Sequence, residues 1–166
     1  MRPARVPALS AALSAAEEAE ILAGVRAGGR PRREASSDLF RRLREPIHAL
    51  CLHVTGRRTD AEAAVQEAFV AVHRGLPDHR GTSRLTTWVY RIALRAAFRA
   101  RARRRGGEPL EGGLASLPAG SRAVLSLFAV EGLSHQEIAD VLGIPEDAVW
   151  TPLQAARRMV VEPAGR

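Results

Sequence analysis

Apolar residues recur at intervals of three and four positions along almost the whole chain of 166 residues. This spacing places them on one face of an α-helix, whereas a half-buried strand would need strict alternation. No segment shows convincing alternation, and the chain contains no internal repeat. The pattern predicts an all-α fold, and the length suffices for one ordinary domain or two small ones.

Capping residues and glycines mark where the predicted helices begin and end. Ser14-Ala-Ala-Glu17 and Ser134-His-Gln-Glu137 both have the form of a capping box, in which serine and glutamate satisfy each other's backbone N–H groups. Pro46 is expected to kink or restart the helix that contains it. Loops are expected at 29–34 and 76–83. Helices are expected at about 14–26, 37–55, 59–75, 84–104, 118–131 and 134–142.

A glycine- and proline-rich stretch at residues 106–113 divides this helical pattern in two. We expect two small helical domains joined by this short linker. They comprise residues 14–105 and 114–162, and a flexible segment, residues 1–13, precedes them.

Charge is divided in the same way as the helices. The chain has a net charge of +7, and all 25 basic residues are arginine. Residues 1–107 contain 21 arginines and 10 acidic residues, a net charge of +11. Residues 108–166 contain four arginines and eight acidic residues, a net charge of −4. The first part therefore has the field expected of a polyanion binder, and the second does not.

Several classes of protein are disfavoured by residue content. Cys51 is the only cysteine, so an internal disulfide is excluded and a reducing compartment fits. No apolar run approaches the roughly 20 residues of a membrane span. The N-terminal stretch lacks a cleavage-like site, so we expect a cytoplasmic protein without direct membrane insertion.

No enzyme or metal centre is predicted. His48 and Cys51 share a helix face, but His53 points about 140° away from His48 at about 100° per residue. Cys51 is most simply a buried small hydrophobe. Paired carboxylates, a nucleophile triad and a phosphate loop are not recognisable, so we expect no catalysis, no cofactor and no metal.

The segment EGLSHQEIADVLGI, residues 131–144, is typical of a helix-turn-helix. It combines the second capping box, a short apolar helix with Ala139, and Gly143 at the turn. A plain helical hairpin is the alternative.

A stripe of arginines runs along the predicted helix 84–104. Trp88 and Phe98 lie at the edges of the stripe. Guanidinium groups hold phosphates and aromatic rings stack on bases, so the pattern favours a nucleic-acid strand. The alternative is a solvated basic face with Trp88 in the core. The members of the stripe are Arg84, Arg91, Arg95 and Arg99.

Taken together, two blocks of this sequence resemble a known family. TDAEAAVQEAFVAVHRGLPDHRGTSRLTTWVYRIALRAAFRARARRR, residues 59–105, resembles region 2 of sigma-70 family sigma factors in the extracytoplasmic-function group. LASLPAGSRAVLSLFAVEGLSHQEIADVLGIPEDAVWTPLQAARRMV, residues 114–160, resembles their region 4. The resemblance implies a factor without catalysis that binds core RNA polymerase, places it on promoter DNA and helps to melt the DNA.

The resemblance also implies three sets of site residues. In the family one base is flipped from the melted −10 strand into a pocket of the loop 79–87. A polymerase set, expected on the β′ clamp helices, is Asp60, Glu62, Val65, Gln66, Glu67 and Phe69. A −10 set is Arg80, Ser83, Arg84, Thr87, Trp88, Arg91, Arg95 and Arg99. A −35 set is Ser134, His135, Gln136, Trp150, Thr151, Gln154, Arg157 and Arg158. The β flap and an anti-sigma factor are further expected partners.

This chain departs from the family pattern at identifiable positions. An acid is usual where Ala63 stands and an aromatic residue where His73 stands. The family's basic residues are absent at 150, 152 and 155. Their loss removes phosphate contacts, which dominate affinity for DNA.

Pro152 would cost about 3 kcal/mol inside a helix. Thr151-Pro-Leu-Gln154 can instead form a capping box with proline at the first helical position. We therefore expect a short turn from Pro145 to Trp150 and a helix that restarts at Thr151. Impaired −35 reading is the resulting hypothesis.

The linker is short for a factor that contacts both promoter elements. Residues 106–116 span at most about 37 Å, whereas the −35 and −10 elements lie about 85 Å apart on B-DNA. We expect the two domains to pack on each other in the free protein and to hide the −10 surface.

Two other functions remain open from the sequence. A sigma-like interaction protein would bind polymerase or another factor through residues 59–70 without initiating alone. A helix-turn-helix regulator that acts without polymerase would need strong duplex binding by the second domain, which its net charge of −4 opposes.

Overall fold

The computed structural model describes residues 13–103 and 117–161, with side chains up to Ala155. Within these ranges every regular element is helical, which confirms the all-α prediction. The N-terminal helices are α1 (Ala15–Ala27), α2 (Gly29–Thr55), α3 (Arg58–Gly75), the 3₁₀ turn η1 (Leu76–Asp78) and α4 (Leu85–Ala102). The C-terminal helices are α5 (Ala119–Leu125), the π-helical turn η3 (Ser126–Val130), α6 (His135–Leu142), the 3₁₀ turn η4 (Glu146–Val149) and α7 (Trp150–Val161).

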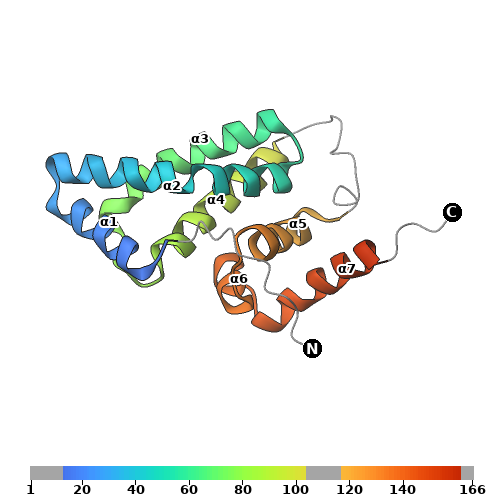
Figure 1. The fold of residues 1–166 in the computed structure, drawn as a ribbon. Helices are drawn as coiled ribbons and strands as arrows, with labels where there is room; N and C mark the ends of the chain where they lie inside the picture. Colours follow the sequence, from blue (N-terminus) through green and yellow to red (C-terminus); the bar gives the residue numbers. More distant parts are fainter. Residues whose placement is uncertain (1–12, 104–116, 162–166) are drawn as a thin grey trace.

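The N-terminal helices form a bundle around one apolar core. Helices α2, α3 and α4 pack along one another, and α1 packs on α2. Figure 1 shows α5, α6 and α7 together on one side of this bundle, with α3 on the other side. Leu43, Ile47 and Leu50 are fully buried on α2, at the helical spacing that the sequence shows.

The start of α2 differs from the sequence prediction. The loop at 29–34 and the helix start at Ser37-Asp38 were wrong, because α2 begins at Gly29. Gly28 and Gly29 have φ values of 70° and 53°, a conformation that strains other residues, and so make the tight turn from α1. The predicted restart at Pro46 does not occur, since α2 continues through it to Thr55.

Other helix boundaries agree with the sequence within one or two residues. Both capping boxes are formed, at Ser14 with Glu17 and at Ser134 with Glu137. Helix α3 begins at Arg58, one residue before the predicted start at 59, and α4 begins at Leu85, one residue after the predicted start at 84.

The turn before α7 also follows the prediction. Residues Glu146–Val149 form a 3₁₀ turn as expected, but α7 already starts at Trp150, so Thr151 lies inside the helix and the predicted capping box at Thr151 was wrong. Pro152 lies in the first turn of α7, where backbone N–H groups have no intrahelical acceptor. The missing N–H of proline therefore costs this helix little.

The C-terminal helices pack on the N-terminal bundle, as the short linker predicts. Helix α5 contacts α2, and α6 contacts α4. Buried side chains of both parts, such as Val89 on α4 and Ile138 on α6, belong to one continuous core. The predicted linker, residues 106–113, lies outside the described residues. No helix in the described part of the chain is long and apolar enough to cross a membrane.

Candidate protein and nucleic-acid interfaces

Helix α3 divides the predicted polymerase set between its exposed and buried faces. Glu62 and Gln66 are exposed, and Asp60 is half-buried. Val65 and Phe69 are only 9% exposed and pack in the core, so they shape the surface from below. Arg58 pairs with Glu62 at 3.2 Å, a contact within one exposed helix turn.

Glu67 lies in an ion-pair network with α4. Arg99 contacts its carboxylate at 2.7 Å and Arg103 contacts it at 3.1 Å. The hydrogen bond from Arg99 is the largest of the effects that lower the pKa of Glu67 below its ordinary value. The resemblance implies that Glu67 contacts polymerase and Arg99 contacts DNA, whereas in the structure the two side chains contact each other.

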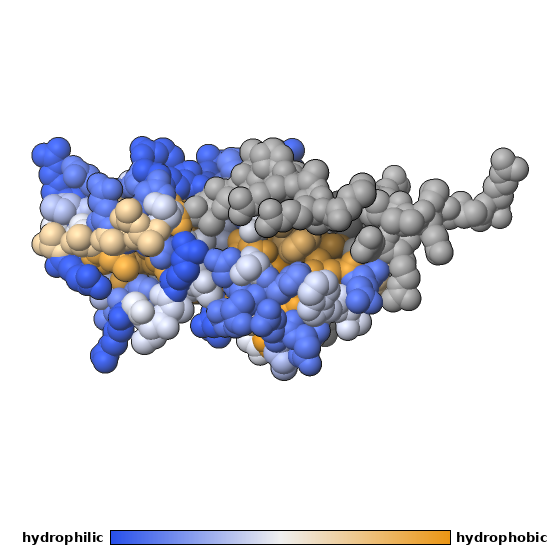
Figure 2. Space-filling model, turned by 60° about the horizontal axis from the view of Figure 1, so that its bottom comes forward, coloured by the Kyte–Doolittle hydropathy of each residue, from blue (hydrophilic) through white to orange (hydrophobic). Residues whose placement is uncertain are grey.

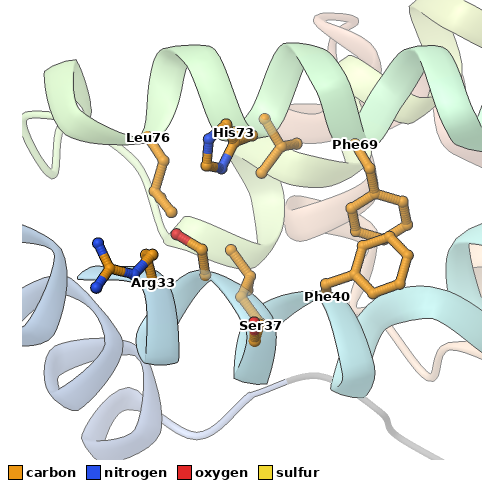
Figure 3. Close-up of a pocket in the computed structure, with 9 residues that line it drawn as sticks. Arg33, Ser37, Phe40, Phe69, His73 and Leu76 are labelled. Carbon is orange, nitrogen blue, oxygen red and sulfur yellow. The ribbon is translucent and has the colours of Figure 1, made fainter. Parts of the chain in front are cut away.

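A groove of about 390 Å³ lies between α2 and α3. Figure 3 shows the rings of Phe40 and Phe69 at one end and Arg33 and Leu76 at the other. The two rings have their centroids 4.2 Å apart, and Phe40 is 42% exposed. His73 lines the groove at the position where the resemblance predicts an aromatic residue. The departure at His73 marks this position in the sequence, but the groove itself was not predicted.

The start of α4 is held by a residue that the sequence did not single out. Glu18, buried on α1, accepts hydrogen bonds from the backbone N–H groups of Leu85 and Thr86, at 3.1 and 3.2 Å. Its carboxylate also accepts a bond from the Thr86 hydroxyl. The first N–H groups of a helix lack internal acceptors, so this carboxylate fixes the α4 N-terminus. An acidic residue on an apolar face was the only available sign.

Trp88 is half-buried and covers the end of α3. Its ring packs so closely on Gly75 that an added Cβ atom there would lie 3.0 Å from the indole. The His79 ring lies 5.1 Å from the Trp88 ring, between centroids. The indole therefore braces the loop between α3 and α4, which agrees with the packing role considered for it.

Two arginines of the α4 stripe are bonded to α6. Arg84 contacts the Glu137 carboxylate at 2.9 Å and donates to the carbonyl of Leu13 at 2.6 Å. Arg91 donates from Nε to the backbone carbonyl of Asp140 at 2.7 Å.

The other members of the −10 set differ in exposure. Thr87 is buried, Ser83 is half-buried, and Arg80 and Arg95 are exposed. A groove of about 240 Å³ between α4 and α6 is lined by Arg91, Arg95 and Phe98, among others.

Helices α6 and α7 form the predicted helix-turn-helix. Gly143 makes the turn with φ 67°, and Ile138 and Val149 are fully buried. This geometry confirms the interpretation of residues 131–144.

An aromatic cluster occupies the surface of this motif. The His135 ring stacks on Phe128 at 5.5 Å and lies 4.2 Å from the Trp150 ring, which is 50% exposed. Ser134 serves as the N-cap of α6, and Gln136 donates to Asp140 at 3.3 Å. Thr151 and Gln154 are exposed. The side chains of Arg157 and Arg158 lie outside the described residues.

The charge of this surface opposes binding to phosphates. Between residues 117 and 155 the only arginine is Arg122, and it is buried. Asp140, Glu146 and Asp147 are exposed. Figure 2 views the molecule from the side of α1, α6 and α7 and shows apolar surface among hydrophilic residues over the C-terminal helices. An acidic surface with exposed aromatic rings is poorly suited to a DNA backbone.

Comparison with known proteins accounts for most of the chain. Residues 39–106 match the family described as sigma-70 region 2, and residues 108–160 match sigma-70, region 4. The chain belongs to the sigma-70 family. The ECF RNA polymerase sigma factor SigM of Mycobacterium tuberculosis is 29% identical over 161 residues, which cover 84% of this chain and 81% of SigM. The RNA polymerase sigma-H factor of Pseudomonas aeruginosa is 30% identical, over 61% of this chain and 71% of that protein.

Solved structures of sigma factors share this fold. CnrH in complex with the cytosolic domain of CnrY superposes with a TM-score of 0.66, at 24% identity, over 85% of this chain and 92% of CnrH. RpoE of Bartonella quintana, in complex with the anti-sigma factor NepR, gives a TM-score of 0.57, at 17% identity, over 77% and 99%. With both matched regions present in order, this sigma factor is of the extracytoplasmic-function group and directs transcription initiation.

Proposed function

We propose that this sigma factor docks on core RNA polymerase through α3, presents α4 to the melted −10 strand, and reads the −35 element weakly. It acts in the cytoplasm by binding, with no catalysis of its own. The observation that carries the proposal is the contrast between its two surfaces. The arginine stripe lies on α4, whereas the helix-turn-helix exposes acids and Trp150.

The exposed side of α3 supports polymerase docking. Glu62, Gln66, Phe69 and His73 share one helix face by their spacing. The first two supply polar groups, and the last two line the apolar groove that runs beside α2. A protein partner can therefore bury an apolar side chain in the groove while it contacts the polar part of the face. The β′ clamp helices are the partner that the resemblance implies, and the β flap would contact the C-terminal domain.

The α4 stripe supports binding of a single strand. Arg80 and Arg95 are exposed, and Phe98 beside Arg95 is 37% exposed. Guanidinium groups attract phosphates, and an exposed ring offers a base a stacking surface. The family's base-flipping step costs a few kcal/mol, which such contacts can return.

The C-terminal surface supports promoter choice that relies mainly on the −10 element. Its acidic residues repel phosphates, and Trp150 occupies a position that is basic in the family. The same observation favours one alternative function, a sigma-like protein that binds polymerase without initiating alone. Regulation by an anti-sigma factor is a further proposal, since RpoE was solved with one.

Transcription in vitro with purified core RNA polymerase tests the proposal. The variant Arg91→Glu with Arg95→Glu should abolish initiation but still bind polymerase, because α3 is untouched. Arg44→Glu, an exposed arginine on α2, is the matched control and should initiate normally. Initiation that survives the double variant contradicts the role of α4. Binding to polymerase without initiation by the unaltered protein establishes the alternative.

A further inference from the structure

Three aromatic rings form a continuous strip on the surface of the C-terminal domain, and we call them the aromatic platform. The ring of His135, at the start of α6, stacks on Phe128 with 12° between the ring planes. Its centroid lies 4.2 Å from that of Trp150, the first residue of α7. Phe128 is 44% exposed and Trp150 is 50% exposed. His135 Nε2 has no hydrogen-bond partner in the described part of the chain, so packing between the other two rings holds this ring in place.

The π-helical turn η3 presents Phe128 to solvent. The N–H of Glu131 donates to the carbonyl of Ser126, five residues earlier, at 3.2 Å, whereas an α-helix would bond it to the carbonyl four residues earlier. With the extra residue in this turn Phe128 is exposed, although Val124, four positions before it, is buried. The Glu131 carboxylate accepts a buried hydrogen bond from the Tyr90 hydroxyl on α4 at 2.5 Å, which fixes the end of the turn. Such turns inside helices are frequent at functional sites.

The exposed charges next to the platform are negative. Glu146 and Asp147 lie in the turn η4, four and three positions before Trp150, and both are exposed. Between residues 117 and 155 the one arginine, Arg122, is buried. The faces of aromatic rings are also electronegative, so rings and carboxylates together attract a cation. The same surface repels the phosphates of a nucleic acid.

Among cations, a guanidinium group fits this surface best. It is planar and weakly hydrated, so it can stack on an aromatic ring and pair with a carboxylate at the same time. An ammonium group is compact and strongly hydrated, and it fits less well. Tryptophan and arginine are also the side chains that most often dominate binding at protein interfaces. The chemistry of the platform therefore matches an arginine-bearing segment of another protein.

We propose that the aromatic platform is a docking site for a cationic, arginine-bearing segment of a protein partner. The guanidinium groups of the partner lie on the exposed rings and pair with Glu146 and Asp147. The resemblance assigns His135 and Trp150 to the −35 set, so the helix-turn-helix of this chain binds a protein with residues that the family uses to read DNA. This role goes beyond the proposed function, because it depends on neither α3 nor α4.

Nuclear magnetic resonance on the full chain supplies the first test, with an acetylated hexaarginine peptide as the probe. The chain has two tryptophans, so their indole N–H signals report separately on the platform and on α4. The variant Trp150→Phe identifies the signal of Trp150. The peptide should shift this signal until it saturates and should leave the signal of Trp88 unchanged. A Trp150 signal that does not move, or equal shifts of both signals, overturns the docking site and leaves the proposed role of α4 intact.

The affinity for the labelled peptide, measured by fluorescence anisotropy, separates the contribution of the rings from that of net charge. Trp150→Ala changes no charge and should weaken binding about two- to fivefold, the size of an exposed cation–π contact. Val70→Ala is the matched control, because Val70 is also 50% exposed and lies on α3, on the other side of the bundle in Figure 1. It should bind as the unaltered protein does. Unaltered affinity in Trp150→Ala overturns the role of the platform.

A second pair of variants tests the carboxylates. Asp147→Asn should weaken peptide binding, whereas Asp78→Asn, at an exposed aspartate of another 3₁₀ turn, should not. Equal losses in the two variants would show attraction to net charge alone and would overturn the site.

Two other occupants of the platform are distinguished by the same Trp150→Ala variant. Its affinity for labelled duplex DNA should equal that of the unaltered protein, and a loss would assign the platform to DNA instead. Sedimentation should show the same molecular mass for both proteins. Self-association that Trp150→Ala abolishes would make the partner a second copy of this chain and would overturn the assignment to another protein.

Discussion

Removing the Tyr90 hydroxyl tests how the buried bond between the domains contributes to stability. Tyr90→Phe keeps the ring in the core but leaves the Glu131 carboxylate without its donor. The other oxygen of Glu131 is also buried and has no hydrogen-bond partner in the described residues. A buried acceptor that loses its donor costs about 1–3 kcal/mol, more when the group is charged. We expect the free energy of unfolding at neutral pH to fall by about 2–3 kcal/mol.

The pH dependence of this loss follows from the pKa of Glu131. Burial raises that pKa above its ordinary value of 4.5, and the hydrogen bond from Tyr90 partly offsets the rise. A carboxyl group whose pKa is raised in the folded state contributes its full stabilisation when the pH is below its ordinary pKa. It loses that contribution as the pH rises through the folded-state pKa. Without Tyr90 the pKa should rise further, so the destabilisation by Tyr90→Phe should grow between pH 4.5 and neutral pH.

Urea denaturation at several pH values, with the second variant Glu131→Gln, completes the test. In the Glu131→Gln background the effect of Tyr90→Phe should be smaller and should not depend on pH in this range. The interaction energy of the two substitutions isolates the pair. A loss below 0.5 kcal/mol, or one that stays constant with pH, would refute the account of the buried bond, since single hydrogen bonds contribute roughly 0.5–1.5 kcal/mol.

Three further predictions concern packing and capping. Gly75→Ala should lower the free energy of unfolding by about 1 kcal/mol, the lower end for overpacking, because its Cβ would meet the half-buried Trp88 ring at 3.0 Å. Gly120→Ala, where nothing lies within 4 Å, should not lower it, and equal effects in urea denaturation would contradict the role of Trp88. Glu18→Gln should lower the free energy of unfolding by about 1–3 kcal/mol, because it weakens the hydrogen bonds at the α4 N-terminus. Glu20→Gln, at an exposed position on the same helix, should leave stability unchanged. Thermal melting of the two variants tests this difference. Cys51 should resist iodoacetamide in the folded protein, since it is buried and burial raises its pKa to about 12. Fast labelling under native conditions would show that the core opens at this point.

The helices were predictable where their signals are local. Both capping boxes and the position of Pro152 follow from residues within one helix turn. Pro31 lies in the first turn of α2 just as Pro152 lies in that of α7. The glycines and arginines around Pro31 are typical of a loop, and the predicted start of α2 was therefore too late.

The site was predictable in its residues but not in its pairings. Spacing places the arginines of α4 on one stripe, but it cannot show that Glu67 holds Arg99 or that Glu137 holds Arg84. Such contacts depend on how helices far apart in sequence are packed. Glu18 illustrates the same limit, because its partners on α4 are more than 60 residues away.

Genome-wide run-off transcription tests the central claim most directly, with core RNA polymerase in the presence and absence of this sigma factor. The account predicts new start sites that share a −10 motif and show no common −35 motif. A shared −35 motif would contradict the role given to Trp150 and the acidic surface around it. An absence of new start sites, with the protein still bound to polymerase, would contradict initiation itself.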